Sequence, residues 1–190
     1  MTKWTVLDEA HEALRTVVRG VPADAWELPT PCSAWNVTQV LQHAAGDQIG
    51  YASFLTGGPG PSEDPFSPSG TLSATPEEVA EAAMRASAEA WADVAADAQE
   101  VSVPIPPNKL SAADGVTACA MDAAVHAWDI AVATGQPSPL TPELARELLP
   151  VARKLVEPLR QWGAFGPVVE GEDGDEAAEL LRYLGRQPVL

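Results

Sequence analysis

The sequence carries a series of helix-start signals, and their spacing leaves room for little besides helices. The strongest is Thr75 followed by Pro76 and Glu78, which combines an N-cap, a proline at the first helical position and a capping-box acid. Asn36 with Gln39 has the same capping-box form. Further helix starts are expected at Ser111, Thr141 and Asp175. No two segments look like paired strands, so the sequence predicts an all-α fold.

The expected helices divide into a bundle and an extension. Within residues 1–135, long helices are predicted over about 4–20, 37–55, 76–96 and 112–135. The Gly/Pro/Ser-rich segment 56–70 is too long for a tight turn, and we expect a crossover or a mobile lid there. These features predict a four-helix bundle with one crossover, against which residues 136–190 wrap as a helical extension of the same single domain. We expect Pro150 and Pro158 to kink or divide the fifth helix.

The chain is strongly acidic, because 27 acidic and 11 basic residues give a formal net charge of −16. Such a surface repels phosphate backbones and anionic lipids, so we expect a small molecule or another protein chain as partner, and neither nucleic acid nor a membrane. No stretch approaches the run of about 18 apolar residues of a membrane helix, and the N-terminus does not look like a secretory signal. Cys32 and Cys119 are then expected to be free thiols in the cytoplasm.

Two of the three histidines lie inside apolar helical patterns. His126 follows Asp122 by four residues, so both side chains project from one face of the fourth helix. His43 lies among small and apolar residues of the second helix. Two neutral imidazoles and one carboxylate suit a catalytic divalent metal, with positions left open for water or substrate. By spacing alone, however, histidines hydrogen-bonded within the core are the commoner explanation.

The stretches "PTPCSAWNVTQVLQHAAGDQ" and "MDAAVHAWDIAVATGQ" resemble the DinB/YfiT-like metalloenzyme family. The closer likeness is to its actinobacterial branch, which includes the N-terminal domain of mycothiol-dependent maleylpyruvate isomerase. It covers nearly the whole chain, up to a tail of the "GAFGP…LLRYLGRQP" type. The resemblance implies a four-helix bundle with an up-down-down-up course. In that fold, one histidine of the second helix and two residues one turn apart on a later helix hold a metal.

Position by position, the resemblance places the metal ligands at His43, Asp122 and His126. Zinc is the first expectation, with nickel or another divalent ion as alternatives. Asp122 stands where the isomerase pattern has glutamate, so either the helices approach more closely or the contact runs through water. The isomerase also has a C-terminal domain that 190 residues are too few to contain. The resemblance therefore implies metal binding and the use of a small thiol, but not the isomerisation itself.

Other polar residues near these positions have roles that the sequence leaves open. Asp47, one turn after the histidine of the second helix, is a candidate fourth ligand, hydrogen-bond acceptor or general base, against a solvated charge at the bundle mouth. Asp129 is expected to bond a neighbouring helix end. Cys119 faces the predicted ligands, but a free cysteine is more commonly a small buried residue. His11 is expected at the surface.

Two classes of function fit these features. One is a metal-dependent enzyme, in which a small thiol of the mycothiol type serves transfer or isomerisation, or metal-activated water gives a hydrolase. The other is a non-catalytic binding or structural module whose metal pins the bundle. An enzyme needs an open coordination position, whereas a structural site is closed by a fourth protein ligand. A homodimer is compatible with either class.

Overall fold

The computed structural model describes residues 3–32, 34–161, 163–171 and 174–188 of the chain. Its helices are α1 (Thr5–Gly20), α2 (Val37–Thr56), α3 (Pro76–Ala92), α4 (Ala112–Ala133), α5 (Pro142–Arg160) and α6 (Glu176–Tyr183). Two short strands, β1 (Val101–Ser102) and β2 (Lys109–Leu110), form an antiparallel pair. The prediction of an all-α fold is confirmed, with this two-residue ladder as a minor addition.

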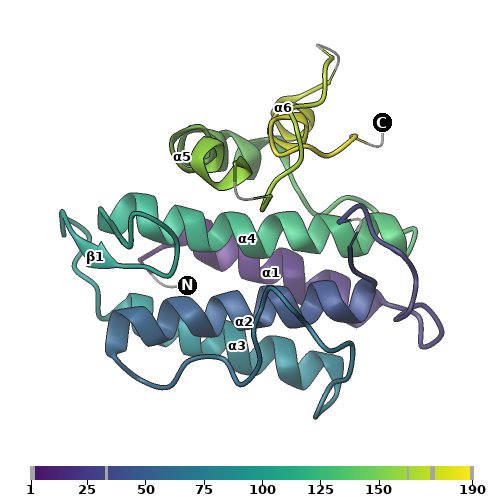
Figure 1. Cartoon of the computed structure of the whole chain (residues 1–190), viewed down its shortest axis with the longest axis horizontal. Helices are drawn as coiled ribbons and strands as arrows, with labels where there is room; N and C mark the ends of the chain where they lie inside the picture. The colour runs from purple at the N-terminus through teal and green to yellow at the C-terminus, as the bar shows by residue number, and fades with distance from the viewer. Residues whose placement is uncertain (1–2, 33, 162, 172–173, 189–190) are drawn as a thin grey trace.

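The first four helices form a bundle with an up-down-down-up course (Figure 1). α1 and α4 run in one direction and α2 and α3 in the other, and the most extensive contacts pair α1 with α4 and α2 with α3. Two consecutive parallel helices need a connection about as long as the bundle. Residues 57–74 supply it by returning along α2, so the Gly/Pro/Ser-rich segment is the expected crossover.

The caps of the helices follow the sequence signals closely. The Asn36 side chain accepts a hydrogen bond from Gln39 N at 2.9 Å, and Gln39 Oε1 accepts one from Asn36 N at 3.1 Å. Thr75 and Glu78 make the equivalent reciprocal pair. A backbone N–H three residues further on donates to the side chains of Ser111, Thr141 and Asp175. Each such cap contributes about 1 kcal/mol and fixes the residue at which its helix begins.

α4 is the central helix of the molecule. It contacts α1, α2 and α5, and most of its residues are buried. Its length and mean hydropathy alone would allow it to cross a membrane, but its apolar residues are interrupted by Asp114, Asp122 and Asp129, and most of the helix is buried inside the fold. The apolar character has a different origin here, because alanines on several faces of α4 let the neighbouring helices pack closely against it.

Three local predictions differ from the structure. α3 ends at Ala92 rather than near residue 96. The proline-rich segment after it, expected to stay unpaired, contains β1 and β2. α5 runs unbroken through Pro150 and Pro158. Both prolines lie on the exposed face of α5, where a carbonyl that loses its helical partner can bind water instead.

α5 packs on α4 and carries α6, and both lie on the side of α4 that faces away from α2 and α3 (Figure 1). α6 ends in a Schellman motif, in which Gly185 N donates to Arg182 O at 3.0 Å and Arg186 N to Leu181 O at 2.8 Å. Gly185 has a φ of 81°. A Cβ at this position would lie 2.8 Å from backbone atoms of Gly166, so both the conformation and the neighbouring chain require glycine.

A second Schellman glycine makes this packing testable. Gly135, which follows α4, has a φ of 68°, but an added Cβ would meet nothing within 4 Å beyond its chain neighbours. Gly135→Ala should therefore lower the free energy of unfolding by about 1 kcal/mol, the cost of the left-handed conformation alone. Gly185→Ala should cost at least about 1 kcal/mol more, because its methyl group overlaps the Gly166 backbone. Urea unfolding measures both, and equal losses would contradict the steric argument.

Candidate metal centre

His43 of α2 and Asp122 and His126 of α4 come together where the two helices face each other. One donor atom from each residue lies within 4.8 Å of the others, and both imidazoles are buried. The four-residue spacing on α4 puts its two side chains on one face. The cap at Asn36 fixes the start of α2 and therefore the direction in which His43 points. The structure thus brings the three predicted ligands into one cluster.

The distances within this cluster suit a shared cation better than hydrogen bonds. Asp122 Oδ1 lies 3.5 Å from His43 Nε2 and 3.4 Å from His126 Nε2. A charge-assisted hydrogen bond between such groups is about 2.7–2.9 Å long. Two ligands that each lie about 2.1 Å from a tetrahedral zinc ion are about 3.4 Å apart. Asp122 Oδ1 therefore stands at a ligand-to-ligand distance from both imidazoles even though its side chain is shorter than that of glutamate.

The second carboxylate oxygen of Asp122 gives a further indication. Asp122 Oδ2 is buried and has no hydrogen-bond partner among the described residues. Leaving a buried carboxylate oxygen without a donor costs free energy. A cation held between the three side chains would remove that cost, as would a hydrogen bond from the protonated carboxyl of the neighbouring Asp47.

The other ring nitrogen of each histidine is already engaged. His43 Nδ1 lies 2.9 Å from Pro65 O, and because a carbonyl only accepts, Nδ1 carries the proton. His126 Nδ1 lies 2.9 Å from Asp129 Oδ2, which fixes the second ring in the same way. In the neutral form, each Nε2 then presents its lone pair to Asp122. Hydrogen-bonded imidazoles of this kind are typical metal ligands.

Asp129 contacts the C-terminal segment as well as His126. Arg186 Nε donates to Asp129 Oδ1 at 2.9 Å and Arg186 Nη2 to Oδ2 at 2.7 Å, and the Asp129 side chain is fully buried. Because Arg186 belongs to the turn that ends α6, Asp129 does bond a neighbouring helix end, although through an arginine side chain. A fully buried carboxylate needs a charged partner, and here that partner comes from beyond α6.

Two aromatic rings flank His43. The Trp35 ring lies 4.7 Å from the His43 ring and the Phe66 ring 5.5 Å from it, measured between centroids. Trp35 comes from the loop before α2 and Phe66 from the crossover, which also provides the Pro65 carbonyl. Sequence reasoning missed these three residues and Arg186. None lies within one helical turn of a ligand, and only the fold places them there.

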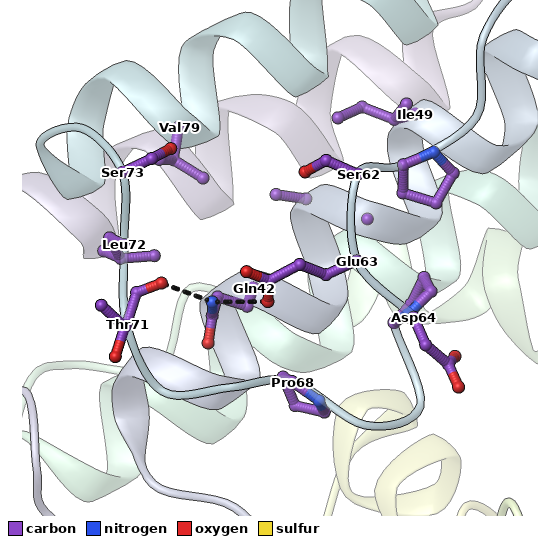
Figure 2. Close-up of a pocket in the computed structure, with 14 residues that line it drawn as sticks. Gln42, Ile49, Ser62, Glu63, Asp64, Pro68, Thr71, Leu72, Ser73 and Val79 are labelled. Carbon is purple, nitrogen blue, oxygen red and sulfur yellow. Dashed lines mark hydrogen bonds between the residues drawn. The ribbon is translucent and has the colours of Figure 1, made fainter.

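The crossover also encloses a separate pocket of about 100 Å³ between itself, α2 and α3 (Figure 2). Gln42 holds the segment there, since its Nε2 donates to Glu63 Oε2 at 3.3 Å and to Thr71 O at 3.0 Å. None of the three clustered ligands lines this pocket. The hydrogen bonds of Gln42 fasten the crossover to α2, the helix that bears His43.

When no other cation is present, protons balance the charge of the cluster. Burial disfavours charge on His126, but the Asp122 and Asp129 carboxylates raise its pKa to about 9. Burial likewise disfavours ionised Asp122, yet the two imidazoles hold the pKa of its carboxyl well below the usual range. Burial and the Asp122 carboxylate raise the pKa of Asp47 to about 7. A metal ion would replace protons in this cluster.

Asp47 lies next to the cluster without joining the three-residue group. It is half-buried rather than a solvated charge. Pro65, and not Asp47, accepts the hydrogen bond from His43.

The two cysteines and His11 lie outside the cluster. Cys119 Sγ contacts Gln48 Oε1 and Ser87 Oγ, and burial raises the pKa of its thiol to about 12. Burial raises the pKa of Cys32 to about 11. His11 is buried and lies 2.8 Å from Gln48 Oε1, so its expected surface position was wrong. Leu7 is buried, and His11 follows it by four residues, so both side chains lie on the same face of α1.

Comparisons with known proteins identify the family of the chain. The family model of the mycothiol maleylpyruvate isomerase N-terminal domain matches residues 7–131. The chain is also similar to two proteins of Mycobacterium tuberculosis, "Uncharacterized protein MT0763" of strain CDC 1551 / Oshkosh and "Uncharacterized protein Rv0738" of strain ATCC 25618 / H37Rv. Each is 32% identical over 184 residues, which cover 93% of both chains. No solved structure matches the chain.

The pKa shifts predict how the metal-free protein responds to pH. A histidine whose pKa rises on folding stabilises the fold below its unfolded value of about 6.5, and this contribution is lost as the pH rises to about 9. Asp47, whose pKa also rises on folding, likewise stabilises the fold at low pH. This contribution is lost as the pH rises from about 4 to about 7. Through these two groups the thermal midpoint should fall as the pH rises from about 5 to about 9, while His11, whose pKa is lowered by burial, opposes the fall below about pH 6.5.

Asp47→Asn should remove the lower part of this slope, because the amide does not titrate. Calorimetric scans of both proteins in chelator check the prediction. A midpoint that rises with pH over this range would contradict the assignment of the two protons.

Proposed function

The chain belongs to the mycothiol maleylpyruvate isomerase N-terminal domain family, and on this premise we propose that it binds a divalent metal ion through His43, Asp122 and His126. The observation that carries the proposal is the cluster itself. Two imidazole Nε2 atoms stand 3.5 and 3.4 Å from one carboxylate oxygen, and the other carboxylate oxygen has no partner among the described residues. Zinc is the first choice for this nitrogen and oxygen donor set, with nickel or another divalent ion next.

The number of protein ligands favours a catalytic centre over a structural one. A structural zinc site is closed by four protein ligands, whereas a catalytic site has three and keeps a position open. In the part of the chain that the structure describes, only three such residues meet here. A non-catalytic module pinned by its metal is therefore the weaker alternative.

We further propose a metal-dependent enzyme that uses a small thiol of the mycothiol type in a transfer or isomerisation reaction. When bound, a divalent ion supplies a Lewis acid that favours the deprotonated form of a coordinated thiol or water. The thiol should come from outside the chain, because burial raises the pKa of Cys32 to about 11 and that of Cys119 to about 12. A hydrolase would use the same three ligands and is the alternative activity.

The residues around the cluster have separate proposed tasks. Trp35 and Phe66 flank His43 and restrict the access of water to its ring. Asp47 is our candidate for the group that accepts or releases a proton, since it lies beside the ligands without being one of them. Pro65 and Asp129 hold the two imidazoles in place.

For the partners, we propose a small-molecule substrate and neither nucleic acid nor membrane. The formal net charge of −16 disfavours contact with polyanions. We propose the cytoplasm as the location, where free thiols such as those of Cys32 and Cys119 persist. A homodimer is compatible with this function.

Replacing a ligand tests the metal site directly. His126→Ala should abolish stoichiometric zinc binding while the helical content stays largely intact, because the ring contributes more to the site than to the core. If Asp122 and His126 were only a hydrogen-bonded pair, the variant would be less stable by about 1–3 kcal/mol. Its metal content would then equal that of the wild type. Metal analysis and thermal unfolding of the same samples distinguish the two results.

His11→Ala is the matched control, since His11 is a buried, hydrogen-bonded histidine outside the cluster. This variant should lose stability and keep its metal. Retention of zinc by His126→Ala would refute the site and the metal-dependent activity together.

The role of Asp47 calls for a different substitution. Asp47→Asn should retain one metal ion per chain, because Asp47 is not among the clustered ligands, whereas Asp122→Asn should lose it. Metal analysis after dialysis measures both variants. Loss of metal from Asp47→Asn would make this residue a fourth ligand and would overturn its proposed role in proton transfer.

A further inference from the structure

We propose that Arg186, in the segment after α6, is a positioning residue of the metal centre, which it controls through Asp129 and His126. The inference rests on the proposed metal site and adds to it a residue from the C-terminal extension. Arg186 lies outside the residues 7–131 that match the family model. Within the described residues, Arg186 forms no hydrogen bond or ion pair with any of the three ligands. It reaches the cluster through Asp129.

The contacts form a continuous chain from the tail to the cluster. Arg186 binds both oxygens of Asp129, at 2.9 and 2.7 Å. Asp129 Oδ2, one of these oxygens, also lies 2.9 Å from His126 Nδ1. The opposite nitrogen of the same ring, Nε2, lies 3.4 Å from Asp122 Oδ1. The position of one arginine therefore sets the direction in which a ligand nitrogen points.

Burial makes this chain specific. The Asp129 side chain is fully buried and that of Arg186 is 10% exposed. A fork of two parallel hydrogen bonds fixes the plane of a carboxylate, whereas a single contact would let it rotate. With its plane fixed, Asp129 can hold the His126 ring in one orientation. Without Arg186, the carboxylate would be a buried charge free to turn away from the ring.

The backbone after α6 is built to deliver this side chain. Arg186 occupies the last position of the Schellman motif, immediately after the left-handed Gly185. The turn packs so closely against Gly166 that Gly185 has no space for a Cβ. α6 itself is joined to α5 by exposed ion pairs, Arg146 with Glu176 and Arg153 with Glu179. The arginine thus projects from a fixed turn rather than from a free tail.

A purely structural clamp would also tie the tail to α4, and the experiment must distinguish the two roles. Zinc affinity is measured by competition with a chromophoric chelator for the wild type, Arg186→Gln, Arg186→Lys and Arg146→Gln. Arg146→Gln is the matched control, because Arg146 is an arginine of the same extension that is far more exposed than Arg186 and pairs with Glu176. Circular dichroism checks the fold of each variant.

Arg186→Gln should weaken zinc binding about 10–100-fold, the usual cost of losing a partner of a ligand histidine. Arg186→Lys keeps the charge but not the fork, so it should fold and show a smaller loss. Arg146→Gln should stay within about twofold of the wild type. Affinities of Arg186→Gln and Arg186→Lys that both stay within about twofold of the wild type would overturn the proposal. If Arg186→Gln does not fold, Arg186→Lys alone decides.

A second measurement separates this inference from the proposed function. In the metal-free protein, the Nδ1 proton of His126 should exchange slowly with solvent, as observed by nuclear magnetic resonance, and faster in Arg186→Lys. If the wild type binds no zinc, the proposed function fails, and this proton still tests the positioning role. Equal exchange in both proteins would overturn the role of Arg186.

Discussion

The Asp122 carboxylate, set in a largely apolar and buried helix, is the constraint on which the rest of the structure depends. Asp122 belongs to α4, which is buried against three other helices. Ionised, it needs cations or donors within reach, and its own helix supplies only His126. The second imidazole must come from α2, so the packing of α2 on α4 is tied to the chemistry of the cluster. The four-helix bundle gives the ligands rigid backbones, and the cluster in turn requires one particular register of those helices.

Two irregular segments, the crossover and the turn after α6, supply hydrogen-bond partners that the helices of the cluster do not provide. Backbone carbonyls within a helix already accept hydrogen bonds from their own helix, and the acceptor for His43 is a loop carbonyl that has no helical partner. The proline-rich crossover supplies it at Pro65, and Gln42 fastens that crossover to α2. On the opposite side, the turn after α6 brings Arg186 to Asp129. The crossover therefore holds His43 directly, whereas His126 is held by Asp129 of its own helix, which is itself fixed by the turn after α6.

This separation along the chain explains which features the sequence could predict. Caps such as Asn36 with Gln39, and the pair Asp122 and His126, depend on residues three or four positions apart, and these predictions were confirmed or met by the geometry. His43 was singled out by its place among apolar residues of the second helix, and the family resemblance then placed a ligand at the same position. Arg186 pairs with a residue 57 positions away. No local pattern indicates such a contact.

The omissions and errors have the same origin or a simpler one. Asp129 was expected to bond a helix end, which the turn after α6 provides, but its partner Arg186 could not be named because it lies 57 residues away. Phe66 belongs to a loop whose course could not be predicted from its composition, although its length correctly indicated a crossover. His11 was misplaced for a local reason, since four-residue spacing from a buried leucine already put it on the inner face of α1.

The charges around the cluster balance in two ways, which connects its acid–base properties to metal binding. Asp47, Asp122 and Asp129 can contribute three negative charges, and Arg186 contributes one positive charge. Without a metal, a proton on Asp47 and another on His126 neutralise the group, in line with pKa values raised to about 7 and about 9. A divalent ion could replace these two protons without changing the net charge of a largely buried site. Burying the ion would then add no uncompensated charge to the core, which is the main cost that a bundle interior imposes on any metal centre.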